Sequence, residues 1–166
     1  MIYHTATKKI KGEKEYFNIT QMVIDEVKKS GVWTGKVIVF PLHTTVGIKR
    51  QEDEPGLMQD IKRAFFRLFP KDTYYEHDDF EKRTVNMAPN ERKNAAAHLM
   101  ATFFTNSLEL ITIKNGELAL GRWQSILFFD FDPKGRGSRE IEIWIEGEPY
   151  PDDNGNGQKN NNHKKS

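Results

Sequence analysis

The chain has 166 residues, no cysteine, and 25 lysine and arginine residues against 24 aspartate and glutamate residues, which gives a formal net charge of +1. The missing cysteine excludes disulfides and thiolate metal sites and leaves the redox compartment open, and the balanced charge gives no overall field that would attract nucleic acid or an anionic membrane. The length suits one domain with its own hydrophobic core. No apolar run approaches the roughly 20 residues of a membrane span, and the N-terminus lacks the apolar centre of a signal peptide, so we expect a cytoplasmic protein.

The N-terminal part alternates between extended and helical patterns. Residues 2–10 alternate weakly and predict a first strand, and residues 15–19 predict a second strand that pairs back on it. Residues 21–30 then carry apolar side chains at helical spacing, and Gly31 is a typical residue to end such a helix.

A long extended segment follows at residues 34–49. Pro41 has no N–H for a strand ladder, so the strand either lies at an edge there or breaks there. The polar sequence His43-Thr44-Thr45 comes directly after that point. A polar cluster at a strand interruption is a candidate site, although a single histidine is more often a hydrogen-bonded spectator.

Acidic residues precede the next predicted helix. Residues 51–54 precede Pro55, which suits a first helical turn, and an apolar stripe from Leu57 to Leu68 follows at helical spacing. The acids, Glu52 among them, are either helix-capping residues or part of a site.

Two further histidines lie in polar surroundings. His77 precedes Asp78 and Asp79, which indicates either a solvated turn or an imidazole beside carboxylates. Residues 91–106 predict a helix on which Asn94 and His98 share a polar stripe near the N-terminal end, where free N–H groups favour an anion.

The stretch from residue 107 to residue 132 predicts three consecutive strands. In residues 107–114 the apolar phase switches, which indicates a bulge or a strand covered on both faces. Asn115-Gly116 is a strong two-residue hairpin signal. Residues 124–131 are nearly all apolar and predict a strand buried on both faces. The junction Gly121-Arg122-Trp123-Gln124 is either the edge of a site or a twisted hairpin with Trp123 in the core.

The chain closes with a loop, a strand and a polar tail. Residues 132–138 form a basic, glycine-rich loop, and residues 139–146 predict a last strand. The remainder has almost no apolar residues. We therefore predict one domain over residues 1–147 and a disordered polar tail over residues 148–166.

Three of the five histidines, namely His43, His77 and His98, thus stand out as candidates for one site. Together with Glu52 or Asp78 they could hold a divalent metal ion, with Mg²⁺ or Zn²⁺ as candidates, and keep one coordination position open. They could equally form an acid/base and anion-binding cluster. Their spacing matches no local ligand motif, so the two alternatives stay open.

Several motifs, taken together in their order and spacing, cover residues 1–147. They are His43-Thr44-Thr45, Gln51-Glu52 ahead of Pro55, Tyr75-x-His77, Asn94-Ala-x-Ala97-His98, Asn115-Gly116, Gly121-x-Trp123-Gln124 and Asp132 running into Gly135-Arg136. This series resembles the YjbQ-like family, the "secondary thiamine-phosphate synthase" group. The chain departs from the family pattern in having Gln51, Arg122 and a lengthened loop before Arg136.

The resemblance implies a compact α+β fold, sandwich-like, of packed antiparallel sheets with about three helices, usually assembled as a homotrimer. It implies an enzyme that joins a pyrimidine diphosphate to a thiazole phosphate and releases diphosphate. It also implies that the three histidines gather in one cleft with Glu52 nearby as catalytic residues. The side chains that we expect to bind phosphate are Asn94, Arg122, Arg136 and Arg139.

Two other functions fit the same residues. One is metal-dependent hydrolysis by a histidine-bound metal ion, with His43, His77 and His98 as ligands. The other is a non-catalytic trimer that binds a metabolite or a metal ion. In all three cases the expected partner is a small molecule, phosphorylated in the first case, and neither nucleic acid nor a membrane is expected.

Overall fold

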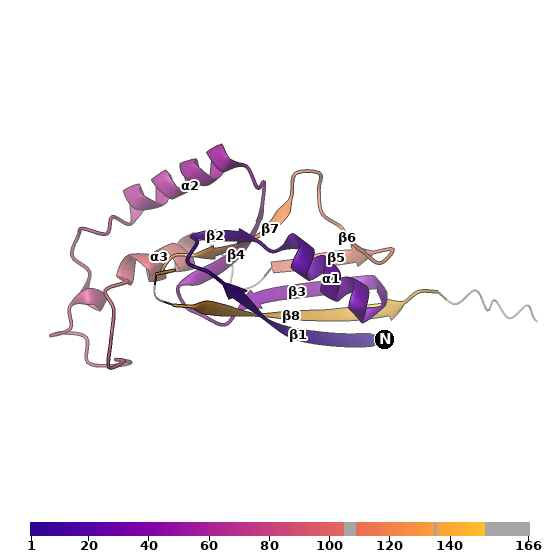
Figure 1. Cartoon of the computed structure of the whole chain (residues 1–166), viewed down its shortest axis with the longest axis horizontal. Coiled ribbons are helices and arrows are strands. Elements are labelled where there is room, and N and C mark those ends of the chain that lie inside the picture. Colours follow the sequence, from indigo (N-terminus) through magenta and orange to yellow (C-terminus); the bar gives the residue numbers. More distant parts are fainter. Residues whose placement is uncertain (105–108, 135, 152–166) are drawn as a thin grey trace, which may run out of the picture.

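The computed structural model describes residues 1–104, 109–134 and 136–151, and it confirms the predicted α+β class (Figure 1). One antiparallel sheet has the strand order β1-β8-β3-β5-β6, and the other has the order β2-β7-β4. We call them sheet A and sheet B. The strands are β1 (Ile2–Lys11), β2 (Tyr16–Asn18), β3 (Val32–Pro41), β4 (Val46–Gln51), β5 (Glu109–Lys114), β6 (Glu117–Leu118), β7 (Ser125–Asp130) and β8 (Ser138–Pro149). The helices are α1 (Thr20–Ser30), α2 (Pro55–Leu68), the short 3₁₀ helix η1 (Glu76–Asp78) and α3 (Ala95–Phe104).

The main hydrophobic core lies between α1 and the two sheets. Strand β8 alternates as predicted, with Ile141, Ile143 and Ile145 buried in this core and Trp144 half exposed on the opposite face. Strand β1 pairs with one edge of β8 and β3 pairs with the other, so β8 is a central strand. This position explains the regular apolar alternation of its sequence.

Strand β7 is buried on both faces, as its apolar sequence predicted. Ile126 and Phe128 belong to the main core, whereas Leu127 and Phe129 belong to a second cluster with Met58 of α2. The strand therefore separates two hydrophobic cores, and every residue from Ile126 to Asp130 is shielded from solvent.

Two tight turns have the backbone that their sequences predicted. Gly31 ends α1 in the left-handed region at φ 70°. Asn115 and Gly116 have φ values of 53° and 76° between β5 and β6, as a two-residue hairpin turn requires.

Several predicted elements differ from the structure in their pairing or boundaries. The strand predicted at residues 15–19 does not pair back on β1; it is β2 and pairs with β7. The extended segment at residues 34–49 divides after Pro41 into β3 and β4, which lie in different sheets. Helix α3 begins at Ala95, four residues later than predicted, because the preceding residues are held by side-chain contacts described below.

The region around the hairpin also differs from the prediction. From Glu109 onward β5 keeps a regular register with β3, with Ile111 and Ile113 buried and Leu110 exposed. The predicted phase switch lies between Leu110 and Ile111, and over Glu109–Ile113 it reflects an exposed Leu110 in a regularly paired strand, not a bulge or a strand covered on both faces. Residues 107 and 108 of the predicted strand lie outside the described residues. Trp123 is 63% exposed, so it does not fill the core.

Strand β8 continues to Pro149, two residues beyond the predicted domain end at residue 147. The ring of Tyr150 then lies against Trp33, with centroids 4.6 Å apart. The rest of the predicted tail, residues 152–166, lies outside the described residues. None of the described helices is long and apolar enough to cross a membrane.

A buried carboxylate links α1 to β1. Glu26 is 3% exposed, and its oxygens contact His4 Nε2 at 2.9 Å, Lys8 Nζ at 2.7 Å and Lys29 Nζ at 2.7 Å. Burial alone would raise the pKa of Glu26, but the N–H donors of Lys29, Lys8 and His4 outweigh it and lower the pKa to about 2.

We predict that Glu26→Gln destabilises the protein by about 3 kcal/mol at neutral pH, because the neutral amide loses the charge-assisted contacts that the buried carboxylate makes with Lys8 and Lys29. A carboxylate with a lowered pKa stabilises the fold above its unfolded pKa and loses that effect as pH falls toward about 2. The stability gap between wild type and variant should therefore shrink below pH 4.5. Urea unfolding across this pH range measures it, with the exposed neighbour Asp25→Asn as control; a constant gap would contradict the prediction.

Candidate functional site

A cavity of about 880 Å³ lies where the β3–β4 turn, η1, the start of α3 and the start of β8 meet. His43, His77 and His98, which are far apart in sequence, all line it. The other lining residues are Leu42, Thr44, Thr45, Glu76, Lys82, Arg83, Val85, Asn86, Glu91, Asn94, Arg136 and Arg139.

His43 is placed by the end of β3. The backbone pairing with β8 continues one step past Pro41, where Leu42 N–H donates to Glu140 O at 3.0 Å. Beyond this point the imidazole replaces a backbone carbonyl as acceptor, because Glu140 N–H donates to His43 Nε2 at 2.8 Å. Burial, followed by the nearby Arg139 cation, lowers the pKa of His43. In its neutral form the ring therefore carries its proton on Nδ1.

His77 and His98 are brought together by a helix cap. Asp78 Oδ1 accepts from the N–H groups of Asn94 and Ala95 at 2.9 and 3.0 Å, which satisfies the free end of α3. This contact fixes η1 against α3, and the rings of His77 and His98 lie 4.6 Å apart between centroids. Burial is the largest cause of the lowered pKa of His98, and the adjacent His77 and Arg83 lower this pKa further.

Arg83 joins His77 to a carboxylate. Its Nη1 lies 3.1 Å from His77 Nε2 and 3.1 Å from Glu91 Oε1, and its Nη2 donates to Asn86 O at 2.9 Å. A guanidinium can only donate, so His77 Nε2 is an acceptor. Neither Arg83 nor Glu91 could be selected from the sequence, because no spacing rule connects them to His77.

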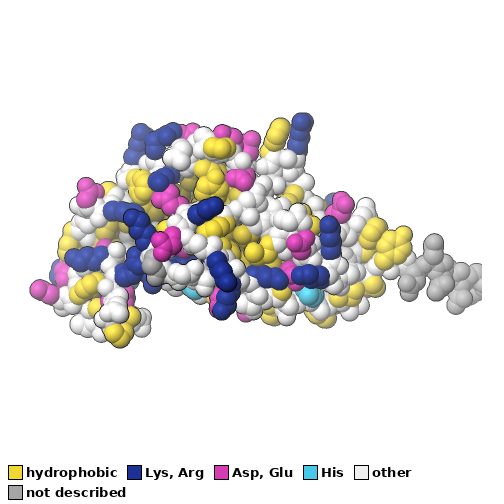
Figure 2. Space-filling view, viewed as in Figure 1, with side chains coloured by type: hydrophobic (Ala, Val, Ile, Leu, Met, Phe, Trp, Pro, Cys, Tyr) yellow, Lys and Arg dark blue, Asp and Glu magenta, His cyan; other side chains and the backbone are white. Residues whose placement is uncertain are grey.

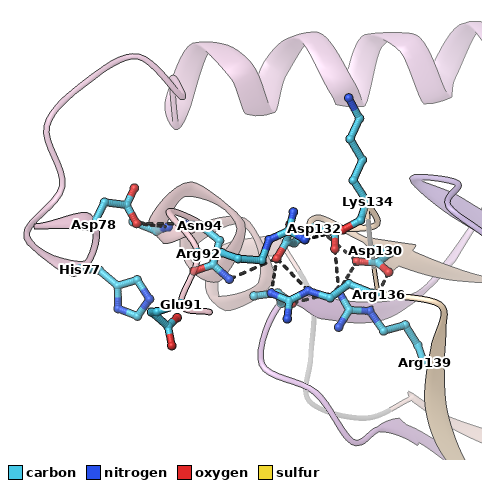
Figure 3. A network of polar contacts seen from close by, with 12 residues as sticks. His77, Asp78, Glu91, Arg92, Asn94, Asp130, Asp132, Lys134, Arg136 and Arg139 are labelled. Atoms are coloured by element: carbon cyan, nitrogen blue, oxygen red, sulfur yellow. Dashed lines mark hydrogen bonds and ion pairs between the residues drawn. The ribbon is translucent and has the colours of Figure 1, made fainter. Parts of the chain in front are cut away.

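The floor beside the histidines is a network of aspartates and arginines (Figure 3). Arg139 donates to both oxygens of Asp130, at 2.7 and 2.8 Å. Asp132 binds Arg136, Arg92 Nη2 at 2.9 Å and Asn94 Nδ2 at 3.2 Å. The network holds Arg136, Arg139 and Asn94, three of the predicted phosphate-binding residues, in the wall of the cavity.

One polar atom in this wall is unused. Asn94 Oδ1 is buried and has no hydrogen-bond partner among the described residues. Buried acceptors normally have a donor, so a bound molecule with an O–H or N–H group would satisfy it.

The three imidazoles do not fit a shared metal ion in this arrangement. Nε2 of His43 and Nε2 of His77 each face an N–H donor, and a metal ligand needs a free lone pair. Within the described part of the chain, no group of three histidine, aspartate or glutamate side chains is placed to hold a metal ion. A metal cofactor therefore stays a prediction from the sequence.

Two predicted site residues lie elsewhere in the chain. Glu52 is exposed and follows β4, whose Val46 end pairs with Asp130 and whose Gln51 end pairs with Ser125. Arg122 lies in the loop before β7, with its guanidinium 4.6 Å from the ring centroid of Trp123. Neither side chain lines the histidine cavity of its own chain. Glu54, not Glu52, caps α2 by accepting from Gly56 and Leu57 N–H at 2.7 Å.

The lowered pKa of His98 predicts how stability depends on pH. The unfolded chain binds more protons than the folded one just below pH 6.5, so the free energy of unfolding should fall as pH drops from 7.5 to 5.5. We predict that His98→Asn reduces this fall, since it removes one of the two histidines whose pKa values are lowered. Urea unfolding at the two pH values tests it. An equal fall in both proteins would show that His98 does not contribute.

The chain matches a known protein family over most of its length. The family model described as "UPF0047 protein YjbQ-like" matches residues 4–148. A UPF0047 protein of Methanothermobacter thermautotrophicus is 32% identical over 81% of this chain and 85% of its own length. A UPF0047 protein of Archaeoglobus fulgidus is 39% identical over 59% of this chain and 68% of its own.

Solved structures agree with this match. A YjbQ-like protein of unknown function from Sulfolobus solfataricus superposes with a TM-score of 0.75 at 28% identity, covering 88% of this chain and 98% of that one. An uncharacterised protein of the same family from Clostridium acetobutylicum gives 0.71 at 31% identity, over 85% and 99%. The chain belongs to the UPF0047, or YjbQ-like, family.

Proposed function

We propose that this protein is an enzyme that acts on a phosphorylated small molecule and that the histidine cavity is its active site. The observation that carries the proposal is the convergence of His43, His77 and His98 with Arg136 and Arg139 on one cavity. Its volume of about 880 Å³ is in the range of small-molecule sites. Imidazoles supply proton donors and acceptors, and guanidiniums suit phosphate oxygens.

The reaction proposed is thiamine-phosphate synthase-like. The nitrogen of a thiazole phosphate attacks the methylene carbon of a pyrimidine diphosphate; the C–N bond forms, the C–O bond breaks, and diphosphate leaves with the electron pair. The chain must stabilise the charge on the departing diphosphate. Arg136 and Arg139 supply positive charge, and neutral His43 and His77 would donate hydrogen bonds from Nδ1, since Nε2 is an acceptor in both.

A carboxylate near the histidines favours catalysis over simple binding. Glu76 and Glu91 line the cavity, and Glu91 is connected to His77 through Arg83. An anion receptor gains nothing from negative charge in its wall, whereas acid/base chemistry uses a carboxylate to orient and polarise an imidazole.

We predict that His98→Asn lowers kcat/KM for thiamine phosphate formation by about 100-fold or more, the usual contribution of a general acid or base. The matched control is Thr102→Ala, an exposed position one turn further along α3. Diphosphate release from the two substrates is the readout. Tight binding of both substrates without turnover in wild type would instead identify a binding protein.

The same assay tests the metal-dependent alternative. Elemental analysis of the purified protein, followed by activity before and after chelation, separates the two chemistries. Activity that survives removal of all metal from the protein supports proton transfer by the histidines alone. Activity that disappears and returns with Zn²⁺ would support a metal-dependent enzyme.

We further propose that the protein works as a homotrimer whose site is completed by a neighbouring chain. Glu52 and Trp123 lie at the Gln51–Ser125 end of sheet B, and His43 lies beyond the Val46–Asp130 end. These ends are about 17 Å apart along the strands. A head-to-tail contact between copies would bring one end against the other, and such contacts close into rings.

Mixed assemblies test this arrangement. His98→Asn and Glu52→Gln chains should each be inactive alone. Co-assembly in equal amounts should restore about one quarter of wild-type activity, because a quarter of the sites then combine an intact His98 from one chain with an intact Glu52 from its neighbour. Sedimentation checks that the variants keep the mass of the wild type. An active species of one chain's mass, or no recovery on mixing, would contradict the proposal.

A further inference from the structure

A second cavity, of about 310 Å³, lies between α2 and the structure beneath it. Most of its lining comes from α2, from α3 with the residues just before it, and from the end of β7 with the loop that follows it; Glu15, Tyr16, Lys71 and Asp78 also line it. Figure 1 shows α2 running above these elements, with one loop joining it to β4 and another joining it to η1. Of the residues that the structure describes, Asn94 alone lines both this cavity and the histidine cavity.

The inner wall of this second cavity is aromatic. Phe65 of α2 contacts Phe131 edge to face, with centroids 5.6 Å apart, and Phe131 stacks in parallel on Phe129 at 6.2 Å. Met58 and Met100 complete the apolar lining. Such a surface packs well against a planar apolar group.

The acidic residues of the lining are already neutralised or hydrogen-bonded. Glu15 pairs with Lys62 at 2.7 Å, and Asp78 caps α3. Asp130 and Asp132 are bound by arginines. None of these carboxylates therefore repels an incoming anion with its full charge.

Uncompensated positive charge remains in the lining. Among the described residues, no ion pair is formed by the side chains of Lys93 or Lys134, both exposed, and Lys71 is placed only over the ring of Phe66, at 5.4 Å from its centroid. Figure 3 shows the Lys134 side chain extending from the polar network toward α2. Figure 2 shows basic side chains around the apolar surface in this part of the molecule.

We propose that this cavity is a second ligand site, for a soluble organic anion with one aromatic or short aliphatic group. The apolar group would lie against Phe65, Phe129 and Phe131, and its phosphate or carboxylate would face Lys93 and Lys134. The volume of about 310 Å³ is at the lower end of the range for small-molecule cavities and is too small for a diacyl lipid. The proposal is independent of the reaction assigned to the histidine cavity.

Phenylphosphonate is a suitable probe, because it has the proposed chemistry and size and resists hydrolysis. Methyl-labelled methionine reports where it binds, since Met58 and Met100 line this cavity and Met87 follows Val85 and Asn86 of the histidine cavity. We expect saturable NMR shifts at Met58 and Met100 that persist in excess inorganic diphosphate. Methylphosphonate, which lacks the ring, should bind at least about tenfold more weakly.

Reversing the charge of the lining lysines provides a second test of the site. The double variant Lys93→Glu, Lys134→Glu should weaken phenylphosphonate binding by about tenfold or more, whereas Lys114→Glu, exposed on β5, should leave it within about twofold of wild type. Circular dichroism verifies that each variant is folded. Shifts confined to Met87, shifts abolished by diphosphate, absence of shifts at Met58 and Met100, or equal affinities for all variants would overturn the proposal.

Discussion

The buried ion pair between Asp130 and Arg139 holds the functional end of this fold together. Asp130 is the last residue of β7 in sheet B, Arg139 is near the start of β8 in sheet A, and both are almost fully buried. Arg139 also donates to Asp132 O at 2.8 Å and lies 3.4 Å from Thr45 Oγ1. One guanidinium thus joins the two sheets and the turn that carries His43. Removal of either partner would leave a buried charge unpaired, which costs about 3–5 kcal/mol.

The rest of the histidine cavity depends on this junction through short steps. Glu140, the neighbour of Arg139, fixes the His43 ring by its backbone N–H. Asp132, two residues after Asp130, holds Arg136 and Asn94. Asn94 stands at the start of α3, where Asp78 attaches the segment that carries His77. Side chains from four parts of the chain are therefore positioned by polar contacts with little backbone regularity, as is common at functional sites.

The two cavities differ in chemistry although they share Asn94. The histidine cavity is lined by titratable and guanidinium groups, and the pKa values of His43 and His98 are lowered because these two rings are partly withdrawn from water beside cations. The cavity under α2 has an aromatic wall, and two of its lysines, Lys93 and Lys134, form no ion pair in the described structure. The first suits proton transfer and phosphate binding; the second suits recognition of an apolar group attached to an anion.

The sequence by itself determined the elements whose signals are local. The apolar run of β7, the alternation in β8, Gly31 and the Asn115-Gly116 turn each depend on neighbours within a few residues, whereas the α+β class was expected from the family resemblance. The three histidines could be selected as candidates because each of them adjoins small polar or acidic residues or shares a polar stripe. The resemblance to the family then predicted that the three histidines gather in one cleft.

Only the tertiary structure decided how these pieces meet. Strand β2 pairs with β7 and not with β1, because pairing between distant segments depends on which apolar faces are left to cover. Arg83, Asp130 and Asp132 act through partners that no periodicity reveals. Glu52 lies at the far end of β4 from the His43 turn, since an extended strand separates its two ends by a fixed rise per residue. Local patterns determine which residues are polar, helical or extended, but the distances between them follow from the packing of the two sheets.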